Sequence, residues 1–177
     1  MAASRPTSRR SPRRRGATHP RYTVDASVFV NAFNPHEDGH AESLAFLAAV
    51  QDVADPVIVP TLLVPELAAA AARASDDSAG ALEYAHATIA LPHVTLVSLT
   101  PAMSRQAGEL AARHRLGGAD AVYVAVARRY GTTVVTRDEE QRSRGSAVVT
   151  CLTPEQALAV RSGAKRGPRR GSPPRVD

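Results

Sequence analysis

Short runs of β-branched residues alternate with longer helical segments along this chain of 177 residues, and this alternation limits its possible folds most strongly. The expected strands are residues 22–24, 56–59, 94–99, 132–135 and 147–152. The expected helices are residues 27–33, 40–52, 60–73, 78–90, 100–114, 120–130 and 154–160. Strands that alternate with helices form parallel sheets covered on both faces. The sequence therefore predicts an α/β protein, a three-layer α/β/α sandwich around a central, mostly parallel, Rossmann-like sheet.

The net charge of +5 is distributed unevenly along the chain. Residues 1–21 contain seven arginines and no acid, whereas residues 161–177 contain six basic residues and one acid. The remaining nine basic and sixteen acidic residues give residues 22–160 a net charge near −7. We therefore expect an acidic folded domain over residues 22–160 between disordered basic tails at 1–21 and 161–177. Such tails suit nonspecific binding to nucleic-acid phosphates, although purely solubilising tails have the same composition.

Four acidic residues stand where an expected strand gives way to a turn or a helix. They are Asp25, Glu66, Asp120 and Asp138. In an α/β sheet, ligands bind beyond the carboxyl ends of the parallel strands. Carboxylates gathered there repel one another unless a hard cation neutralises them, and oxygen-only sites suit Mg²⁺ or Mn²⁺. The sequence thus predicts a metal-dependent enzyme that acts on phosphate.

Each aspartate in this set also has a structural explanation, because Asp is a common helix N-cap. Asp25 and Asp120 adjoin the starts of expected helices, and Asp138 can close a turn. Glu66 is harder to explain in this way, since it lies in an otherwise apolar helical segment and an unpaired buried carboxylate is costly. The conjunction of the four acids favours a functional site over four separate caps.

The four acids lie in recognisable motifs at residues 24–27 (VDAS), 65–67 (PEL), 118–127 (GADAVYVAVA) and 134–138 (VVTRD). These motifs resemble those of PIN-domain nucleases, and most closely the ribonuclease toxins of VapBC-type toxin–antitoxin pairs. The resemblance covers residues 22–160. It implies a PIN-like fold, hydrolysis of RNA phosphodiester bonds with a divalent metal, and a small antitoxin protein as partner.

Roles for the acids follow from this resemblance together with metal chemistry. Asp25 and Asp120 are expected as central ligands of one or two Mg²⁺ or Mn²⁺ ions. Glu66 and Asp138 are expected as outer ligands or as groups that orient water.

Neighbouring polar residues are expected to support the acids and to hold the substrate. Ser27 and Thr136 can hydrogen-bond to the carboxylates, although hydroxyls at strand ends and helix caps also have ordinary structural roles. Three arginines, Arg137, Arg142 and Arg144, flank the last acid and can hold an RNA backbone, because guanidinium groups bind phosphate with two hydrogen bonds.

Other enzyme classes are disfavoured by what the sequence contains and lacks. Residues 36–40 match the H-E-x-x-H zinc-hydrolase signature, but Pro35 and Gly39 predict a turn where that site needs a continuous helix. Residues 22–160 contain no lysine, which argues against phosphoryl-transfer domains that use an active-site lysine. A P-loop motif is also absent from the sequence.

The remaining expectations concern location and assembly. The single cysteine, Cys151, lies in an apolar run and is expected to be a buried strand residue in a reducing compartment. No apolar stretch is long enough to span a membrane, and none follows Arg9 and Arg10, so we expect a cytoplasmic protein. The alanine-rich helices are compatible with a homodimer. Two alternatives stay open: a noncatalytic RNA-binding or assembly module with a PIN-like fold, and a PIN nuclease of RNA processing that is not a toxin.

Overall fold

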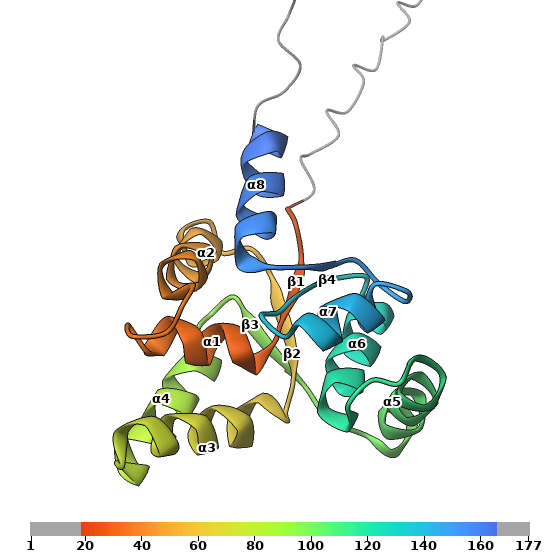
Figure 1. Cartoon of the computed structure of the whole chain (residues 1–177), viewed down its shortest axis with the longest axis horizontal. Helices are drawn as coiled ribbons and strands as arrows, with labels where there is room; N and C mark the ends of the chain where they lie inside the picture. Colours follow the sequence, from red (N-terminus) through yellow and green to blue (C-terminus); the bar gives the residue numbers. More distant parts are fainter. Residues whose placement is uncertain (1–18, 166–177) are drawn as a thin grey trace, which may run out of the picture.

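The computed structural model describes residues 19–165, which form one parallel sheet with helices packed on both faces (Figure 1). The sheet order is β3-β2-β1-β4-β5. The strands are β1 (Tyr22–Val24), β2 (Val57–Pro60), β3 (Val94–Val97), β4 (Thr133–Val135) and β5 (Cys151–Leu152). The helices are α1 (Ala26–Phe33), α2 (His40–Asp52), α3 (Leu63–Ser75), α4 (Ser78–Ile89), α5 (Pro101–His114), α6 (Gly118–Tyr130), α7 (Glu139–Gly145) and α8 (Pro154–Lys165). The predicted α/β class is confirmed.

The sheet separates two apolar cores, because successive side chains of a strand point to opposite faces. In β2, Val57 and Val59 join the core that includes residues of α1 to α4, whereas Ile58 joins the core of α5 and α6. Figure 1 shows α1 to α4 on one side of the sheet and α5 to α7 on the other. Residues 121–127 of α6 are all buried. As its uniformly apolar sequence predicts, α6 is therefore a central helix.

Two helix ends illustrate how the sequence sets the elements. The Thr100 hydroxyl accepts a hydrogen bond from the Met103 N–H at 3.2 Å, and Pro101 occupies the first position of α5, as predicted. Gly131 ends α6 with a φ of 63°. Glycine adopts this left-handed conformation without steric cost, so the chain can turn directly into β4.

Several predicted boundaries differ from those in the structure, and two of the differences have a clear physical reason. Periodicity predicts a helix from residue 60, but Pro60 is the last residue of β2 and α3 begins at Leu63. Pro65 is tolerated there because amides in the first helical turn have no intrahelical partner. The strand predicted over 147–152 is only two residues long, because the Val148 N–H donates to the Gly145 carbonyl at 2.8 Å and forms a turn.

Helix α7 is not predicted from the sequence. Its residues are mostly polar, and only Gln141 and Gly145 are buried. It packs against α6 and β5. A helix with so small a buried face has no apolar periodicity to reveal it.

The folded region extends past residue 160, where the basic tail is expected to begin. Helix α8 continues to Lys165, and the buried Arg161 forms an ion pair with the buried Asp55. A second guanidinium nitrogen of Arg161 donates to the Ala49 carbonyl at 2.6 Å. His19 Nδ1 lies 3.0 Å from the same aspartate. Both ends of the described region therefore meet at Asp55, and the rest of the expected tails (1–18 and 166–177) lies outside the described residues.

Cys151 was expected to be a buried strand residue, and the structure confirms this. Cys151 is buried in β5, and burial raises the pKa of its thiol, which suits a core residue rather than a nucleophile. Within residues 19–165, no helix is long and apolar enough to cross a bilayer.

Candidate active site

Four acidic side chains line one cavity beyond the carboxyl ends of adjacent strands. Asp25 follows β1 directly, and Asp138 lies three residues beyond the end of β4. Glu66 and Asp120 lie in the first turns of α3 and α6. The cavity has a volume of about 460 Å³, and all four residues contribute to its wall. The structure thus brings together the four acids selected from the sequence.

Asp25 is the most buried of the four acids, with 7% of its surface exposed. Its Oδ2 accepts a hydrogen bond from the Ser27 N–H at 2.9 Å, which makes it the N-cap of α1. Its Oδ1 lies 3.4 Å from Nε2 of Gln141. Burial raises the pKa of Asp25, and hydrogen bonds from Ser27 and Gln141 oppose that rise. Asp25 is therefore a helix cap, as its structural explanation predicts, and it also lines the cavity.

Ser27 and Thr136 fasten the turn after β4 to the start of α1. The Thr136 hydroxyl accepts a hydrogen bond from the Asp138 N–H at 3.0 Å. The Ser27 hydroxyl accepts one from the Arg137 N–H at 3.1 Å and lies 3.4 Å from the Thr136 hydroxyl. Ser27 thus supports Asp25 through its own amide, whereas Thr136 holds the backbone of Asp138 instead of its carboxylate.

Glu66 is oriented by Tyr123, which the sequence motifs do not single out. The Tyr123 hydroxyl donates to Glu66 Oε2 at 2.6 Å. Tyr123 is fully buried in α6, and burial together with the charges of Asp25 and Glu66 raises its pKa, so the hydroxyl keeps its proton and acts as the donor. Its position three residues after Asp120 could have identified it from the sequence, because this spacing places Tyr123 and Asp120 on one face of α6.

The buried apolar residues of α3 do not contribute to the cavity wall. Leu63, Leu67 and Ala71 are buried at the four-residue spacing of a helix face. Glu66 itself is half-buried on the face that lines the cavity, together with Arg73. Glu66 thus lies on a different face of α3 from the buried apolar residues, and its carboxylate has a hydrogen-bond partner in Tyr123.

Asp120 lies against a glycine that leaves room for its carboxylate. A Cβ atom at Gly117 would lie 2.7 Å from Asp120 Oδ2. The backbone of Gly117, with φ −57° and ψ 152°, suits any residue, so its missing side chain is what matters. Burial raises the pKa of Asp120 to about 6, and the charges of Asp138 and Asp25 contribute to the rise.

The donor set of this cavity fits a hard divalent cation that keeps part of its water. All four side chains offer carboxylate oxygens, and burial and neighbouring charges raise the pKa of three of them. Among residues 19–165, no three His, Cys, Asp or Glu side chains come close enough together to enclose an ion. Mg²⁺ commonly binds through one or two carboxylates, with water and substrate phosphate completing its shell. The four acids fit that open arrangement.

The three arginines expected to bind substrate each have a partner within the protein. Arg137 Nη2 donates to the Asp38 carbonyl at 2.9 Å. Arg142 and Arg144 form exposed ion pairs with glutamates of their own helix, α7. Arg73 was missed by sequence reasoning, and it is a basic residue in the wall of the acidic cavity. Arg73 could have been found from its spacing of seven residues from Glu66, because two helical turns place the two residues on the same face of α3.

The H-E-x-x-H match has no helix to support a zinc site. Residues 34–39 form turns, and α2 begins only at His40. His36 is exposed, whereas His40 Nδ1 lies 3.0 Å from the Asn31 carbonyl. As predicted, this motif is a loop that leads into a helix.

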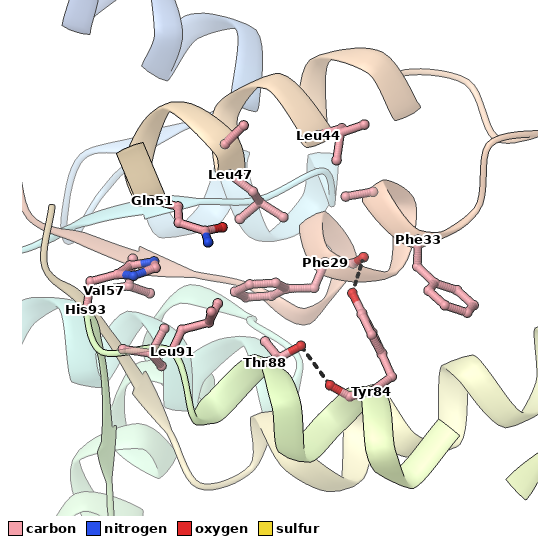
Figure 2. A pocket seen from close by; sticks show the side chains of 13 residues that line it. Phe29, Phe33, Leu44, Leu47, Gln51, Val57, Tyr84, Thr88, Leu91 and His93 are labelled. Carbon is pink, nitrogen blue, oxygen red and sulfur yellow. Dashed lines mark hydrogen bonds between the residues drawn. The ribbon is translucent and has the colours of Figure 1, made fainter. Parts of the chain in front are cut away.

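A second cavity, of about 360 Å³, lies between α1, α2 and α4 and has a mainly apolar wall (Figure 2). The Tyr84 hydroxyl, on α4, donates across it to the Phe29 carbonyl of α1 at 2.9 Å. Phe33 and Leu44, which contribute to the wall, are 42% and 50% exposed. Exposed apolar side chains grouped in this way are typical of surfaces that bind other proteins.

Comparison with protein families gives one match. The model described as the PIN domain matches residues 22–146, which include all four acids of the cavity. No curated protein sequence matches the chain with significance.

Several solved structures have a similar fold. Mycobacterium tuberculosis VapC20, described as a sarcin–ricin loop cleaving toxin, is 22% identical with a TM-score of 0.60, and the match covers 70% of this chain and 95% of that one. PAE2754 from Pyrobaculum aerophilum is 21% identical with a TM-score of 0.58, over 85% and 94% of the two chains. VapBC2 from Rickettsia felis, solved bound to a DNA fragment from its promoter, is 14% identical with a TM-score of 0.56, over 75% and 97%. At these identities the likeness establishes a common fold.

Proposed function

This chain belongs to the PIN domain family, and from that premise we propose that it is a metal-dependent endoribonuclease and the toxin of a toxin–antitoxin pair. The observation that carries the proposal is the joint placement of Asp25, Glu66, Asp120 and Asp138 in the wall of one cavity. Their mutual repulsion raises the affinity of the folded protein for protons, and a divalent cation would relieve it.

In this proposal the two inner acids, Asp25 and Asp120, are the central metal ligands. Glu66 and Asp138 would contact the metal ion through a water molecule, or would orient the water that attacks the phosphate. Mg²⁺ or Mn²⁺, when bound, would supply a water of lowered pKa and would offset negative charge on the phosphate. The Ser27 amide fixes one oxygen of Asp25, and the Tyr123 hydroxyl fixes one oxygen of Glu66, so the protein holds these carboxylates in position before any ligand binds.

The RNA backbone is proposed to pass the acidic cavity beside α3 and α7. Arg73 lies in the cavity wall and can bind a phosphate with two hydrogen bonds. Arg142 and Arg144 pair with exposed glutamates, and exposed ion pairs contribute only about 0–1 kcal/mol, so a phosphate can replace those partners. Arg137 is held more firmly, because it donates to two backbone carbonyls, whereas Arg144 donates to one, that of Arg115.

Cleavage of RNA by the purified protein tests this function. Wild type, Asp25→Asn and Asp120→Asn are compared in Mg²⁺ or Mn²⁺, with and without a chelator. Arg105→Gln, at an exposed position of α5 outside the cavity wall, serves as a control. We expect wild type and the control to cleave, the two site variants to be inactive, and the chelator to stop cleavage. Equal cleavage by all four proteins would contradict the proposal. Equal RNA binding without any cleavage would favour the noncatalytic RNA-binding alternative.

The antitoxin is proposed to place an apolar helical segment in the cavity between α1, α2 and α4. Support comes from the exposed side chains of Phe33 and Leu44 and from the similar fold of VapBC2. The test is copurification with the product of the adjacent reading frame. Leu44→Glu should abolish copurification, whereas Leu99→Glu, at an apolar site between β3 and α5 that is 40% exposed, should leave it intact. Copurification that survives Leu44→Glu would contradict this placement.

A further inference from the structure

Gln141 is a polar side chain in a position where an apolar residue would be more stable. It lies in α7 with none of its surface exposed. Its Oε1 has no hydrogen-bond partner within the described part of the chain. Exchanging the two ends of the amide does not help, because the oxygen would then face a carboxylate oxygen and the nitrogen would be unpaired. A buried polar atom without a partner destabilises a fold, so retention of this residue calls for another reason.

The other end of this side chain contacts the acidic cavity from behind. Gln141 Nε2 donates to Asp25 Oδ1 at 3.4 Å, and the backbone N–H of Gln141 donates to Asp138 Oδ1 at 2.7 Å. The second oxygen of Asp25 already accepts from the Ser27 amide. One residue therefore joins the acid that follows β1 to the acid that follows β4, and it completes the donors that hold the Asp25 carboxylate.

We propose that Gln141 is a positioning residue of the metal site, which fixes the orientation of the Asp25 carboxylate and its separation from Asp138. This inference rests on the proposed function. Gln141 is fully buried and does not contribute to the cavity wall, so it acts through the two aspartates and not on the substrate. Groups that hold metal-binding carboxylates in place commonly change metal affinity when they are replaced.

The decisive variant is Gln141→Met, because methionine is unbranched and similar in length but cannot donate a hydrogen bond. Binding of Mn²⁺ is measured by titration, with the electron paramagnetic resonance signal of the free ion as the readout. We expect Mn²⁺ affinity to fall by about tenfold or more. The Tm of the metal-free variant should stay close to that of wild type, because the substitution removes the unpaired amide oxygen and also one hydrogen bond to Asp25, and these two effects have opposite signs.

Two controls separate positioning from general effects on the fold. Ser143→Ala changes an exposed residue of the same helix. Thr88→Val removes a buried hydroxyl of α4 that donates to the Tyr84 carbonyl at 2.9 Å, far along the chain from the acids. Both variants should retain wild-type affinity for Mn²⁺.

Two results would overturn the inference alone: wild-type Mn²⁺ affinity in Gln141→Met, or a loss of affinity accompanied by a metal-free Tm that falls by more than about 4 °C. A different result would overturn the proposed function instead. That result is a wild-type protein that binds no Mn²⁺, or an Asp120→Asn variant that binds it as tightly as wild type.

Discussion

Two of the four acids cap a helix and line the cavity with the same side chain. Asp25 caps α1 and Asp138 caps α7, yet both line the cavity. A cap fixes a carboxylate because one oxygen accepts from backbone amides, and the remaining lone pairs stay available for a cation. Capping and metal binding are therefore compatible roles, and a capping explanation does not by itself argue against a site.

The cavity is costly to the metal-free protein, which gives a prediction for Asp120→Asn. The folded-state pKa of Asp120 is about 6, above its usual value of 3.8. Its proton therefore stabilises the fold fully below pH 3.8, and this contribution is lost as the pH rises through about 6. At pH 7.5 with chelator we expect the variant to be more stable than wild type by about 1 kcal/mol, or about 2–4 °C in Tm, after discounting for solvent screening of this partly exposed group.

Comparing Asp120→Asn with wild type at a lower pH and with Mg²⁺ tests whether charge repulsion causes the difference in stability. At pH 4 the advantage of Asp120→Asn should shrink, because the wild-type carboxyl is then largely protonated. Added Mg²⁺ should raise the Tm of wild type more than that of the variant. Thermal unfolding measures all of these quantities. A variant that is less stable at pH 7.5 and responds equally to Mg²⁺ would contradict the charge-repulsion account.

At this scale the sequence revealed the acids but not the residues that hold them. The acids stand out because all four stand where an expected strand gives way to a turn or a helix. Tyr123, Gln141 and Arg73 do not, since each belongs to a residue type with many ordinary places in a helix. Their importance depends on which side chain lies opposite in space, and spacing along the chain does not supply that information.

Among the elements, the short turn before α6 controls one acid directly. Gly117→Ala should displace the Asp120 carboxylate, because the new Cβ would lie 2.7 Å from Oδ2. We expect several-fold weaker Mg²⁺ binding and slower RNA cleavage, with little change in stability because the aspartate side chain can rotate.

Gly118→Ala is the matched control for that substitution. A Cβ atom there would meet no atom within 4 Å, and the residue is already helical. We expect unchanged metal binding and a small gain in stability of about 0.5–1 kcal/mol. Isothermal titration calorimetry with both variants measures the difference. Equal Mg²⁺ affinity in the two would show that the carboxylate position does not matter.

Some helices can be predicted from their own sequence, whereas others form only because of the residues packed around them. Helix α6 was predictable because its residues are apolar nearly all round, and α5 because Thr100 and Pro101 mark its start. Helix α7 was not predictable, because it is mostly polar and buries only two residues. Since α7 carries Gln141, the proposed metal site depends on this polar helix despite its weak sequence signal.

Over the whole molecule, the site exists because β2, β1 and β4 are neighbours in a parallel sheet. Strand order brings together acids that are up to 113 residues apart in the chain, from Asp25 to Asp138. The parallel topology was predictable from the alternation of strands and helices. The end of the domain was not, because the basic residues of 161–177 resemble a solvated tail in composition.

The ion pair between Asp55 and Arg161 makes the last helix part of the folded unit. Arg161→Met should lower the free energy of unfolding by about 3–5 kcal/mol, because it leaves the buried Asp55 carboxylate without its partner. The double variant with Asp55→Asn should recover part of that loss. Urea unfolding measures both. A loss below about 1 kcal/mol for the single variant would place the end of the folded unit before Arg161.

The central claim is that the four acids form one divalent-metal site that serves RNA cleavage. Its most direct test is a crystal structure of the protein soaked in Mn²⁺, with anomalous scattering used to locate the ion. The account predicts an anomalous peak in the cavity beside Asp25 and Asp120, and no such peak in crystals of Asp120→Asn treated in the same way. Well-ordered crystals with Mn²⁺ bound only elsewhere, or with the same peak in both proteins, would contradict it.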